Sequence, residues 1–397
     1  MPRTILTLLV VTSMTLVNQV AAAVLGGVPA SQASQATPQR RWQRLALSAR
    51  LSMSVIALVL ATCLTGTLQA AETTPIRFPA DAGLVDVTTY GAKGDGKTDD
   101  TAAITKAIGD HVGHSATIYF PPGTYLVSDR LDWRSKEGTA RCWLAFQGAG
   151  PEHSIIRLKD ATFTDPKNPK GVVRTNSEFQ GWNGDKPEQN QIGYGNKAFF
   201  NSLRDLTIDV GVGNPGAIGI EYMANNRGTL RNLVIRSSDP QGAGDCGIDM
   251  RRYGPGPALC VDVVIEGFAI GMDLAHWEYG MTFDNLTLRH QTQVGIRNNN
   301  HSLAIENLVY EGSASVYQAL EGNGLLTVLN ATITGKGSAT DKPAFNNQGG
   351  LYLRNATATG FRCLVRHNEQ DVPGLSAKLY TSSQPVVRGN GPANGLQ

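Results

Sequence analysis

Hydrophobic and polar residues repeat along the chain from residue 203 to about residue 360. Seven segments share an alternation of apolar and polar positions, and their starts lie 22 to 30 residues apart. This spacing is typical of a solenoid in which each repeat forms one coil and variable loops absorb the differences in length. The segments are LRDLTIDV at Leu203, LRNLVIRS at Leu230, CVDVVIEG at Cys260, FDNLTLRH at Phe283, IENLVYEG at Ile305, VLNATITG at Val328 and LRNATATG at Leu353.

A second short strand is predicted in most coils, where the chain reads AIGIEY, CGIDMR, IGMDLA and VGIRNN. The alternation of the first strands predicts that Leu206 and Ile208, with their counterparts, face inward, whereas residues 207 and 209 face outward. The polar residue just before the first strand of each coil is expected to face inward as well and to form a polar ladder at a bend. These residues are Asp205, Asn232, Asp262, Asn285, Asn307, Asn330 and Asn355.

The segment before the coils reads VDVTTYGAKGDGKTDDTAAITKAI from Val85 and then ATIYFPPGTYLVS. Thr98 to Thr101 supply oxygens that can cap a short helix, Ala102 to Ile108, so Asp99 and Asp100 are interpreted as structural. This helix could cover the open end of a solenoid. The segment resembles the opening of the pectate lyase-like superfamily, which includes rhamnogalacturonase and epimerase-like domains, glycoside hydrolase family 28-related proteins and family 55 exo-glucanases.

The resemblance implies an all-β fold, a right-handed parallel β-helix with a short N-terminal capping helix, in a carbohydrate-active protein. Fold does not determine activity in such a superfamily. The Asn-Thr-Asp, Gly-His-Gly and Arg-Ile-Lys motifs of polygalacturonases are absent from the coils, so no catalytic residue is carried over from that branch. Family 55 enzymes contain two tandem β-helices, and the coils here account for about one.

Composition and charge narrow the class of protein. A hydrophobic content of 41% and a charged content of 17% fit a chain with a large core. The net charge of +2 has no basic runs, so nucleic acid is not an expected partner. Four cysteines follow residue 71, and either a Cys246–Cys260 bridge or buried free thiols would fit them.

The first 71 residues carry two segments that look like export signals. One runs from Arg3 to Ala23, and the other has arginines before the apolar run 53–68 and ends at Ala71. We expect the second to be the working signal, with Glu72 near the mature N-terminus; the alternative leaves residues 51–68 as a membrane anchor. The expected organisation is an export region at 1–71, a cap segment at 72–130 and coils at 131–397, clearest from 203 to 360, in a secreted or periplasmic protein.

Two outward columns of side chains differ in charge pattern. The first strands give Asp209, Arg236, Glu266, Arg289 and Glu311, which alternate in sign and form a structural ladder. The second strands give Glu221, Asp249, Asp273 and then Arg297. Three adjacent like charges need raised pKa values, a bound cation or arginines from a neighbouring column, and such a cost is typical of functional sites. The alternative is that the acids simply pair with arginines as part of the scaffold.

Glu221, Asp249 and Asp273 are therefore the candidate catalytic residues for cleaving the glycosidic bonds of a polysaccharide. Calcium-assisted β-elimination with an arginine base is the second possibility, and binding without catalysis the third. Only the lyase would need a cofactor, calcium, and no metal ligands are assigned. The candidate substrate-binding residues lie near these acids and offer rings, hydrogen-bonding groups and charges: Arg251, Arg252, Tyr253, His276, Trp277, Glu278, Arg297 and His301.

Overall fold

The computed structural model describes residues 73–177, 197–252, 255–275, 279–319 and 324–382. The chain divides into two compact units, Met1–Glu72 and Thr73–Gln397, and every described residue belongs to the second unit. No helix in the described ranges combines the length and apolar character needed to cross a membrane.

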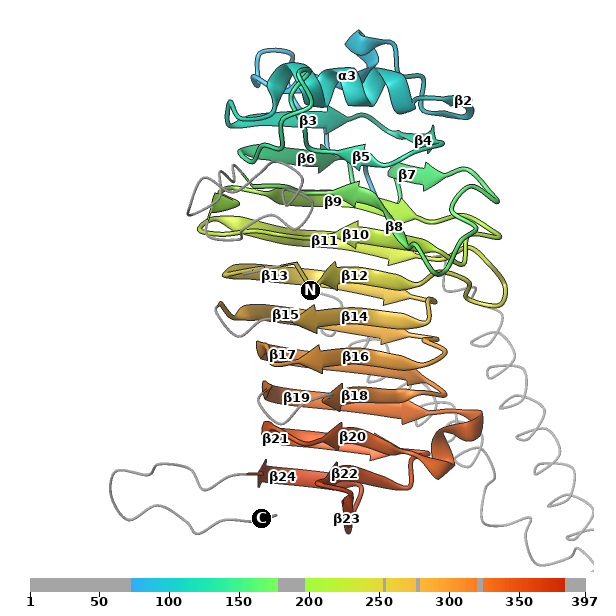
Figure 1. Cartoon of the computed structure of the whole chain (residues 1–397), viewed down its shortest axis with the longest axis vertical. Helices are drawn as coiled ribbons and strands as arrows, with labels where there is room; N and C mark the ends of the chain where they lie inside the picture. The colour runs from blue at the N-terminus through green and yellow to red at the C-terminus, as the bar shows by residue number, and fades with distance from the viewer. Residues whose placement is uncertain (1–72, 178–196, 253–254, 276–278, 320–323, 383–397) are drawn as a thin grey trace, which may run out of the picture. The chain divides into compact units, whose positions relative to one another are not determined.

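The described unit is a right-handed parallel β-helix built from two long sheets, and Figure 1 shows its strands stacked coil upon coil. The larger sheet pairs β1 (Val85–Asp86), β3 (Ala116–Phe120), β6 (Leu144–Gly148), β9 (Ser202–Asp209), β11 (Gly228–Arg236), β13 (Ala258–Glu266), β15 (Met281–Arg289), β17 (Ser302–Gly312), β19 (Leu325–Gly335), β21 (Gly350–Thr359) and β24 (Ser376–Thr381), and it also takes in β2 (Asp95–Asp99), β4 (Gly123–Val127) and β7 (Ser154–Leu158). The second sheet pairs β5 (Leu131–Asp132), β8 (Lys170–Arg174), β10 (Ala217–Glu221), β12 (Cys246–Met250), β14 (Ile270–Ala275), β16 (Val294–Asn299), β18 (Ser315–Ala319), β20 (Pro343–Asn347), β22 (Cys363–His367) and β23 (Gln370–Val372).

Inward side chains stack in register through the core. Leu206 pairs with Leu233 of the next coil and Ile208 with Ile235, and all four are at most 1% exposed. In the second sheet Ile220 continues into the matching apolar residues of β12, β14 and β16. The inward positions predicted from the alternation are confirmed, and burial of these columns removes a continuous apolar surface from water.

One residue in each long strand adopts the left-handed conformation and bends the strand. Asn285 and Asn307 both have φ of 58°, and the Asp or Asn of the other coils is similar. Asn and Asp tolerate this conformation better than other residues with a β-carbon. The side chains of Asn285 and Asn307 are exposed, so the predicted inward orientation is wrong, because a left-handed residue interrupts the alternation of the strand. The predicted ladder is confirmed, since Asn307 Nδ2 donates to Asn285 Oδ1 at 3.1 Å and Asn330 Nδ2 to Asn307 Oδ1 at 3.3 Å.

A column of glycines runs through the second sheet at Gly219, Gly247, Gly271 and Gly295. A β-carbon at Gly271 would lie 2.4 Å from the carbonyl oxygen of Gly295, and one at Gly219 would lie 2.4 Å from Cγ2 of Ile235. The strands therefore approach more closely here than any side chain permits. The residues just before these glycines form a small buried cluster apart from the main core: Ile218, Cys246, Ile270 and Val294.

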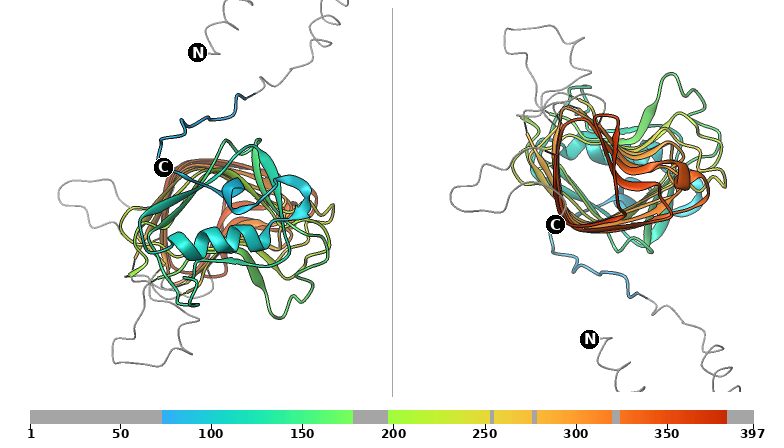
Figure 2. Two further views of the ribbon diagram at one scale, coloured as in Figure 1. Left: turned by 90° about the horizontal axis from the view of Figure 1, so that it is seen from above. Right: turned by 90° about the horizontal axis from the view of Figure 1, so that it is seen from below.

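Helix α3 (Thr101–His111) covers the first coil, and Figure 2 shows it lying across the open end of the coils. The helix turns its own side chains Ile104, Ala107 and Ile108 inward, where they are fully buried. Asp99 accepts hydrogen bonds from the amide and hydroxyl of Thr101, while Asp100 accepts from the amides of Lys93 and Gly94. Among the described residues, η2 (Val87–Tyr90) and η5 (Gly337–Asp341) are short 3₁₀ helices. At the other end, β24 and β23 pair antiparallel with β21 and β22.

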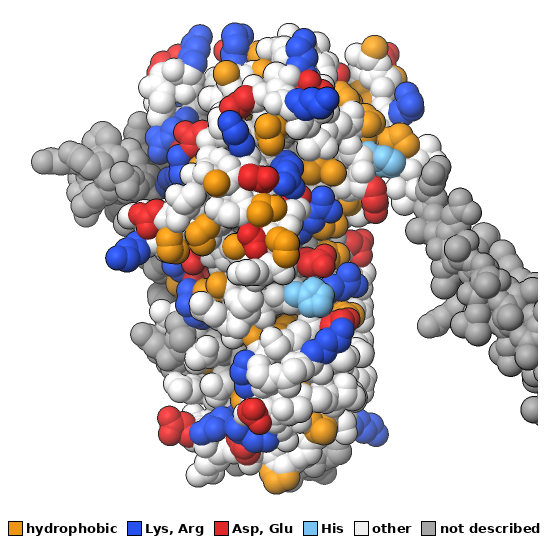
Figure 3. All heavy atoms as spheres, turned by 90° about the vertical axis from the view of Figure 1, so that its right-hand side faces the viewer, with side chains coloured by type: hydrophobic (Ala, Val, Ile, Leu, Met, Phe, Trp, Pro, Cys, Tyr) orange, Lys and Arg blue, Asp and Glu red, His pale blue; other side chains and the backbone are white. Residues whose placement is uncertain are grey.

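The surface charges are mixed in sign, and Figure 3 shows acidic and basic side chains interspersed on one face. The predicted alternating column is in register, because Asp209, Arg236, Glu266, Arg289 and Glu311 pair in succession. The described cysteines are buried free thiols, so the Cys246–Cys260 bridge is not formed.

Candidate functional site

The three candidate catalytic acids lie side by side on the outer face of the second sheet. Glu221 pairs with Asp249, Asp249 with Asp273, and Asp273 with Arg297. Neighbouring strands are about 4.8 Å apart, so these residues form one continuous row, which we term the site column. Toward the cap, the same position is occupied by Arg174 on β8 and Asp132 on β5. The register inferred from the sequence is confirmed for all four residues.

Glu221 is held by two arginines from the first coils. Its side chain is 11% exposed; Arg130 Nη2 lies 2.6 Å from Oε1, and Arg174 Nε lies 3.3 Å from Oε2. The amide of Gly171 donates to Oε1 at 2.7 Å. A β-carbon at Gly171 would meet the Glu221 side chain at 2.8 Å, so the glycine gives this carboxylate its position.

Asp249 and Asp273 share one guanidinium. Arg251 donates to Asp249 through Nε at 3.0 Å and Nη2 at 2.8 Å, and its Nε lies 3.4 Å from Oδ2 of Asp273. Arg297 donates to Asp273 through Nε at 3.1 Å and also through Nη2. Hydrogen bonds to Asp249 and Asp273 raise the pKa of Arg251 and Arg297 respectively. Repulsion between the acids could be relieved by raised pKa values, by a bound cation or by neighbouring arginines, and the structure contains the arginines.

Two predicted substrate-binding residues lie away from the outer face of the column. Arg252 donates to the carbonyl oxygens of Thr175 and Glu221, both at 2.7 Å, and burial, with a smaller effect of Arg174, lowers its pKa to about 10. His301 is 1% exposed, and its amide donates to Asn298 Oδ1. The Arg252 guanidinium is bound to backbone carbonyl oxygens and the His301 side chain is buried, so the structure does not bring them to the surface with Arg251 and Arg297. Tyr253, His276, Trp277 and Glu278 lie outside the described residues.

A fourth acid, Asp245, stands next to the site column and was missed in the sequence. It immediately precedes β12, and its electrostatic neighbours are Arg251, Asp249, Asp273 and Arg297. Burial raises the pKa of Asp245; Arg251 lowers it, and the carboxylates of Asp249 and Asp273 raise it further, so that the net shift is upward. The sequence carried a signal for it, since GDCGID places an additional acid just ahead of the strand.

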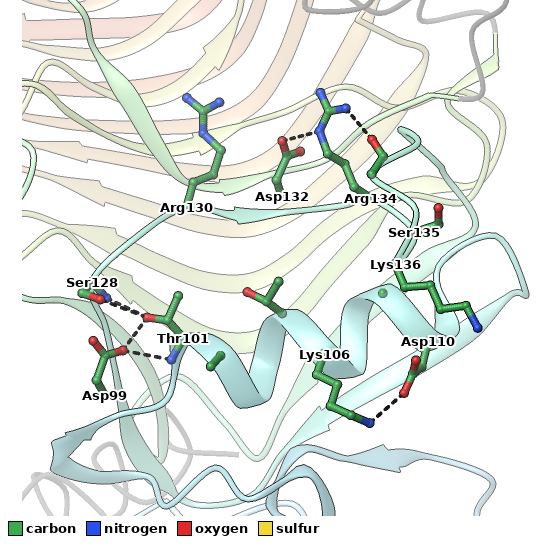
Figure 4. Close-up of a pocket in the computed structure, with 14 residues that line it drawn as sticks. Asp99, Thr101, Lys106, Asp110, Ser128, Arg130, Asp132, Arg134, Ser135 and Lys136 are labelled. Carbon is green, nitrogen blue, oxygen red and sulfur yellow. Dashed lines mark hydrogen bonds and ion pairs between the residues drawn. The ribbon is translucent and has the colours of Figure 1, made fainter.

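The site column leads toward a hollow beside the cap helix. This hollow, which we term the cap hollow, has a volume of about 750 Å³ and lies between α3 and residues 128–138. Figure 4 shows the helix with Thr101, Lys106 and Asp110 beside the segment that carries Arg130, Asp132 and Arg134. Arg130 and Asp132 line it, and Arg130 is also the partner of Glu221. Arg130 was missed in the sequence because it lies ahead of the clear repeats, where no column could be aligned.

The donor set does not fit calcium. Calcium takes six to eight oxygen ligands. In the described part of the chain no group of three His, Cys, Asp or Glu side chains is arranged to hold a metal ion, and each acid of the site column is already paired with an arginine. A reaction step through calcium therefore has no support from these residues.

The bent strands, the covering helix and the outward row of acids and arginines define a pectate lyase-like β-helix. The family model described as "Rhamnogalacturonase A/epimerase, pectate lyase-like" matches residues 84–343, and the chain belongs to this family. The resemblance found in the sequence is thereby confirmed, and it extends well beyond the cap segment.

Individual relatives are similar over parts of the chain. A glucan 1,3-beta-glucosidase of Cochliobolus carbonum is 24% identical over 212 residues, which are 49% of this chain and 24% of that protein. Alginate lyase 7 of Azotobacter vinelandii is 31% identical over 170 residues, 39% of this chain and 18% of that protein. The chain thus spans a quarter or less of the length of these relatives. Among solved structures, the A-module of the mannuronan C-5 epimerase AlgE6 from Azotobacter vinelandii is 19% identical, with 71% of this chain and 75% of that chain covered and a TM-score of 0.40.

Proposed function

We propose that this protein is an exported enzyme that cleaves glycosidic bonds of a polysaccharide at the site column. The observation that carries the proposal is the row of carboxylates in register on one outer strand face, in a family whose relatives include glucan glucosidases and an alginate lyase. Two carboxyl groups are what glycoside hydrolysis requires.

The roles follow from the two kinds of environment in the site. Asp249 and Asp273 are both paired with guanidinium groups, and one Arg251 nitrogen lies within 3.4 Å of both. A retaining reaction needs a proton donor and a nucleophile about 5 Å apart. Asp245, whose pKa is raised by burial and by these carboxylates, is suited to be the proton donor.

In the proposed reaction, Asp245 gives its proton to the glycosidic oxygen while the carboxylate of Asp273 attacks the anomeric carbon. The carbon–oxygen bond of the leaving sugar breaks as the ester bond to Asp273 forms. Water, deprotonated by Asp245, then attacks the same carbon and releases the second product and the free carboxylate. Glu221 and Asp249, together with Arg251 and Arg297, orient the sugar units on either side.

The test is an assay of reducing ends and unsaturated products on neutral and uronic-acid polysaccharides, with Asp273→Asn, Asp249→Asn and Glu221→Gln beside the wild type. We expect reducing ends without unsaturated products and a loss of about 10³-fold or more in kcat for Asp273→Asn. Unsaturated products would instead indicate a lyase.

Binding without catalysis is the second candidate, and the observation that favours it is that each acid of the site column is already paired with an arginine. Wild type that binds glycans and releases nothing from the whole panel would establish this candidate and refute the enzyme.

Export is proposed from the two signal-like segments before residue 72. Expression with its own N-terminus, followed by N-terminal sequencing of the protein outside the cytoplasm, is expected to give a chain that starts near Glu72. A retained segment 51–68 in a membrane fraction would refute this processing.

A further inference from the structure

The alternating column on the outer face of the larger sheet contains an acid and a base without ion-pair partners. Arg236 and Glu311 in this column have partners within the chain. Between them lie Glu266 on β13 and Arg289 on β15, which are neighbours in register. Within the described part of the chain, neither of these two side chains forms an ion pair or a hydrogen bond. Arg289 is exposed and Glu266 is half-buried, so both charges can meet a group outside the chain.

The order of charges along the column is self-complementary. From β11 to β17 it reads Arg236, Glu266, Arg289 and Glu311, and Figure 1 shows these strands as successive rungs. Taken in the opposite direction, the same order has the opposite sign at every position. A second copy related by a two-fold axis between Glu266 and Arg289 therefore meets the column with an opposite charge on each of the four rungs. A parallel copy at the same height would set each charge against its like, so the charges select the antiparallel orientation.

A column of β-branched side chains runs beside the charges. Val234, Val264, Thr287 and Val309 each stand two residues before a charged position and point to the same side of the sheet. Val309 is 42% exposed, and the other three are half-buried. β-branched side chains are stiff and lose little freedom when they are covered. Contact with the same column of a second copy would therefore remove apolar surface from water at a low cost in entropy.

A hollow opens beside Glu266 at the corner that follows β11 and β13. This hollow, which we term the corner hollow, has a volume of about 350 Å³ and is also lined by Asp239 and His290. None of its eight described lining residues is Lys or Arg. Asp239 is held in place by hydrogen bonds from the amides of Gly213 and Gln241, which lower its pKa. The space beside Glu266 can therefore admit the end of a long cationic side chain, and its charge favours one.

We infer that the protein forms an antiparallel dimer through this face of the larger sheet, with Arg289 of each copy pairing with Glu266 of the other beside the corner hollow. The partner is a second copy because the charges of the column complement themselves, and one two-fold axis satisfies all four rungs. The pairs lie at the surface, so the dimer is expected to be weak and to dissociate as salt is raised. The inference is independent of the proposed function, since the site column belongs to the other sheet.

Sedimentation velocity with the full chain tests the dimer over a range of about 1 to 100 μM protein at low and high salt. In a symmetric dimer, Glu266→Arg and Arg289→Glu each place like charges opposite one another twice. Each variant alone should therefore self-associate about tenfold or more weakly than the wild type. An equimolar mixture of the two variants should associate about as tightly as the wild type, because every reversed charge then meets its opposite.

Lys93→Glu is the matched control, because it reverses an exposed charge in the cap segment, and it should associate as the wild type does. Thermal melting verifies that the variants are folded. If a reversal is not folded, Glu266→Gln and Arg289→Gln replace the two reversals, and each should weaken association about 2- to 5-fold.

The inference is overturned if the wild type stays monomeric at low salt, if the variants associate like Lys93→Glu, or if the mixture of reversals associates no better than either variant alone. A wild type that stays monomeric but binds a short arginine peptide in a Glu266-dependent manner would assign the corner hollow to a different, basic partner. A dimer that the variants leave intact would place the contact on another face.

Discussion

Gly271→Ala tests whether the glycine column positions the acids of the site. The added β-carbon would lie 2.4 Å from the carbonyl oxygen of Gly295 and 3.3 Å from Cδ2 of Leu288. The nearer atom belongs to the backbone of β16 and cannot rotate away. Strand β14 or β16 must therefore move, and Asp273 lies only two residues further along β14.

The size of the effect follows from this contact. The strands must separate by roughly 0.6 Å even to reach 3.0 Å, the distance below which real β-carbons are essentially not found. Overpacking of this kind costs about 1 to 3 kcal/mol, and the reduced freedom of the unfolded chain returns about 0.4 to 1 kcal/mol. Displacement of Asp273 from Arg297 by a similar distance should lower kcat about tenfold or more.

Urea unfolding and a polysaccharide cleavage assay measure the two effects on one preparation. Gly337→Ala is the control, because Gly337 has φ of 56° with no atom within 4 Å of an added β-carbon. It should lose about 1 kcal/mol from backbone strain and keep its kcat. Gly271→Ala with wild-type stability and activity would refute the idea that close strand contact at this glycine positions the site.

Three further predictions concern the scaffold and the site. Asn307→Ala should lower the urea midpoint more than Asn307→Gly, by a difference of about 1 kcal/mol in stability, because only glycine adopts the left-handed bend freely; equal losses would contradict this. Burial raises the pKa of Asp209, but the hydroxyl of Ser238, an amide and two arginines outweigh burial, so the pKa in the folded protein is held below 3.8. The stabilisation from Asp209 is therefore present above the pKa of the unfolded chain and is lost as the pH falls through the pKa of the folded protein. Asp209→Asn should flatten the decline in urea midpoint between pH 5 and pH 2.5, and an unchanged slope would refute the assignment. The raised pKa of Asp245 should place a decline in kcat/KM on the alkaline side of the pH profile, because the proton donor is lost there. Asp245→Asn should lower kcat/KM about 10²-fold or more and remove that decline. A pH profile that is the same in the variant and the wild type would exclude Asp245 as the acid.

The fold could be predicted from the sequence because the same alternation of apolar and polar residues recurs in each repeat. Inward Leu206 and Ile208 recur in every coil, and stacking such positions is the way a solenoid builds one core. The register of Glu221, Asp249 and Asp273 followed from the same alignment. The orientation of Asn285 and Asn307 did not follow, because alternation assumes an extended chain, and a single left-handed residue resets it.

The site was only partly predictable for a related reason. Arg130 reaches Glu221 from a coil whose spacing does not match the later repeats, and Arg252 turns toward backbone carbonyl oxygens rather than outward. The raised pKa of Asp245 arises from burial, from Asp249 four residues along the chain and from Asp273 on β14, and neither the burial nor the nearness of Asp273 is visible in the letters around it. Spacing along the chain gives the order of the coils, but it does not give the path of a long side chain.

The corners between the two sheets vary in length while the strands stay aligned. Nine residues separate β11 from β12, and two separate β17 from β18, yet the pairing through β12, β14, β16 and β18 is kept. Segments can therefore be inserted or deleted at a corner in evolution or by engineering without displacing the neighbouring rungs. Such a scaffold can acquire a new substrate preference by changes in its edges alone, while the acids stay where they are.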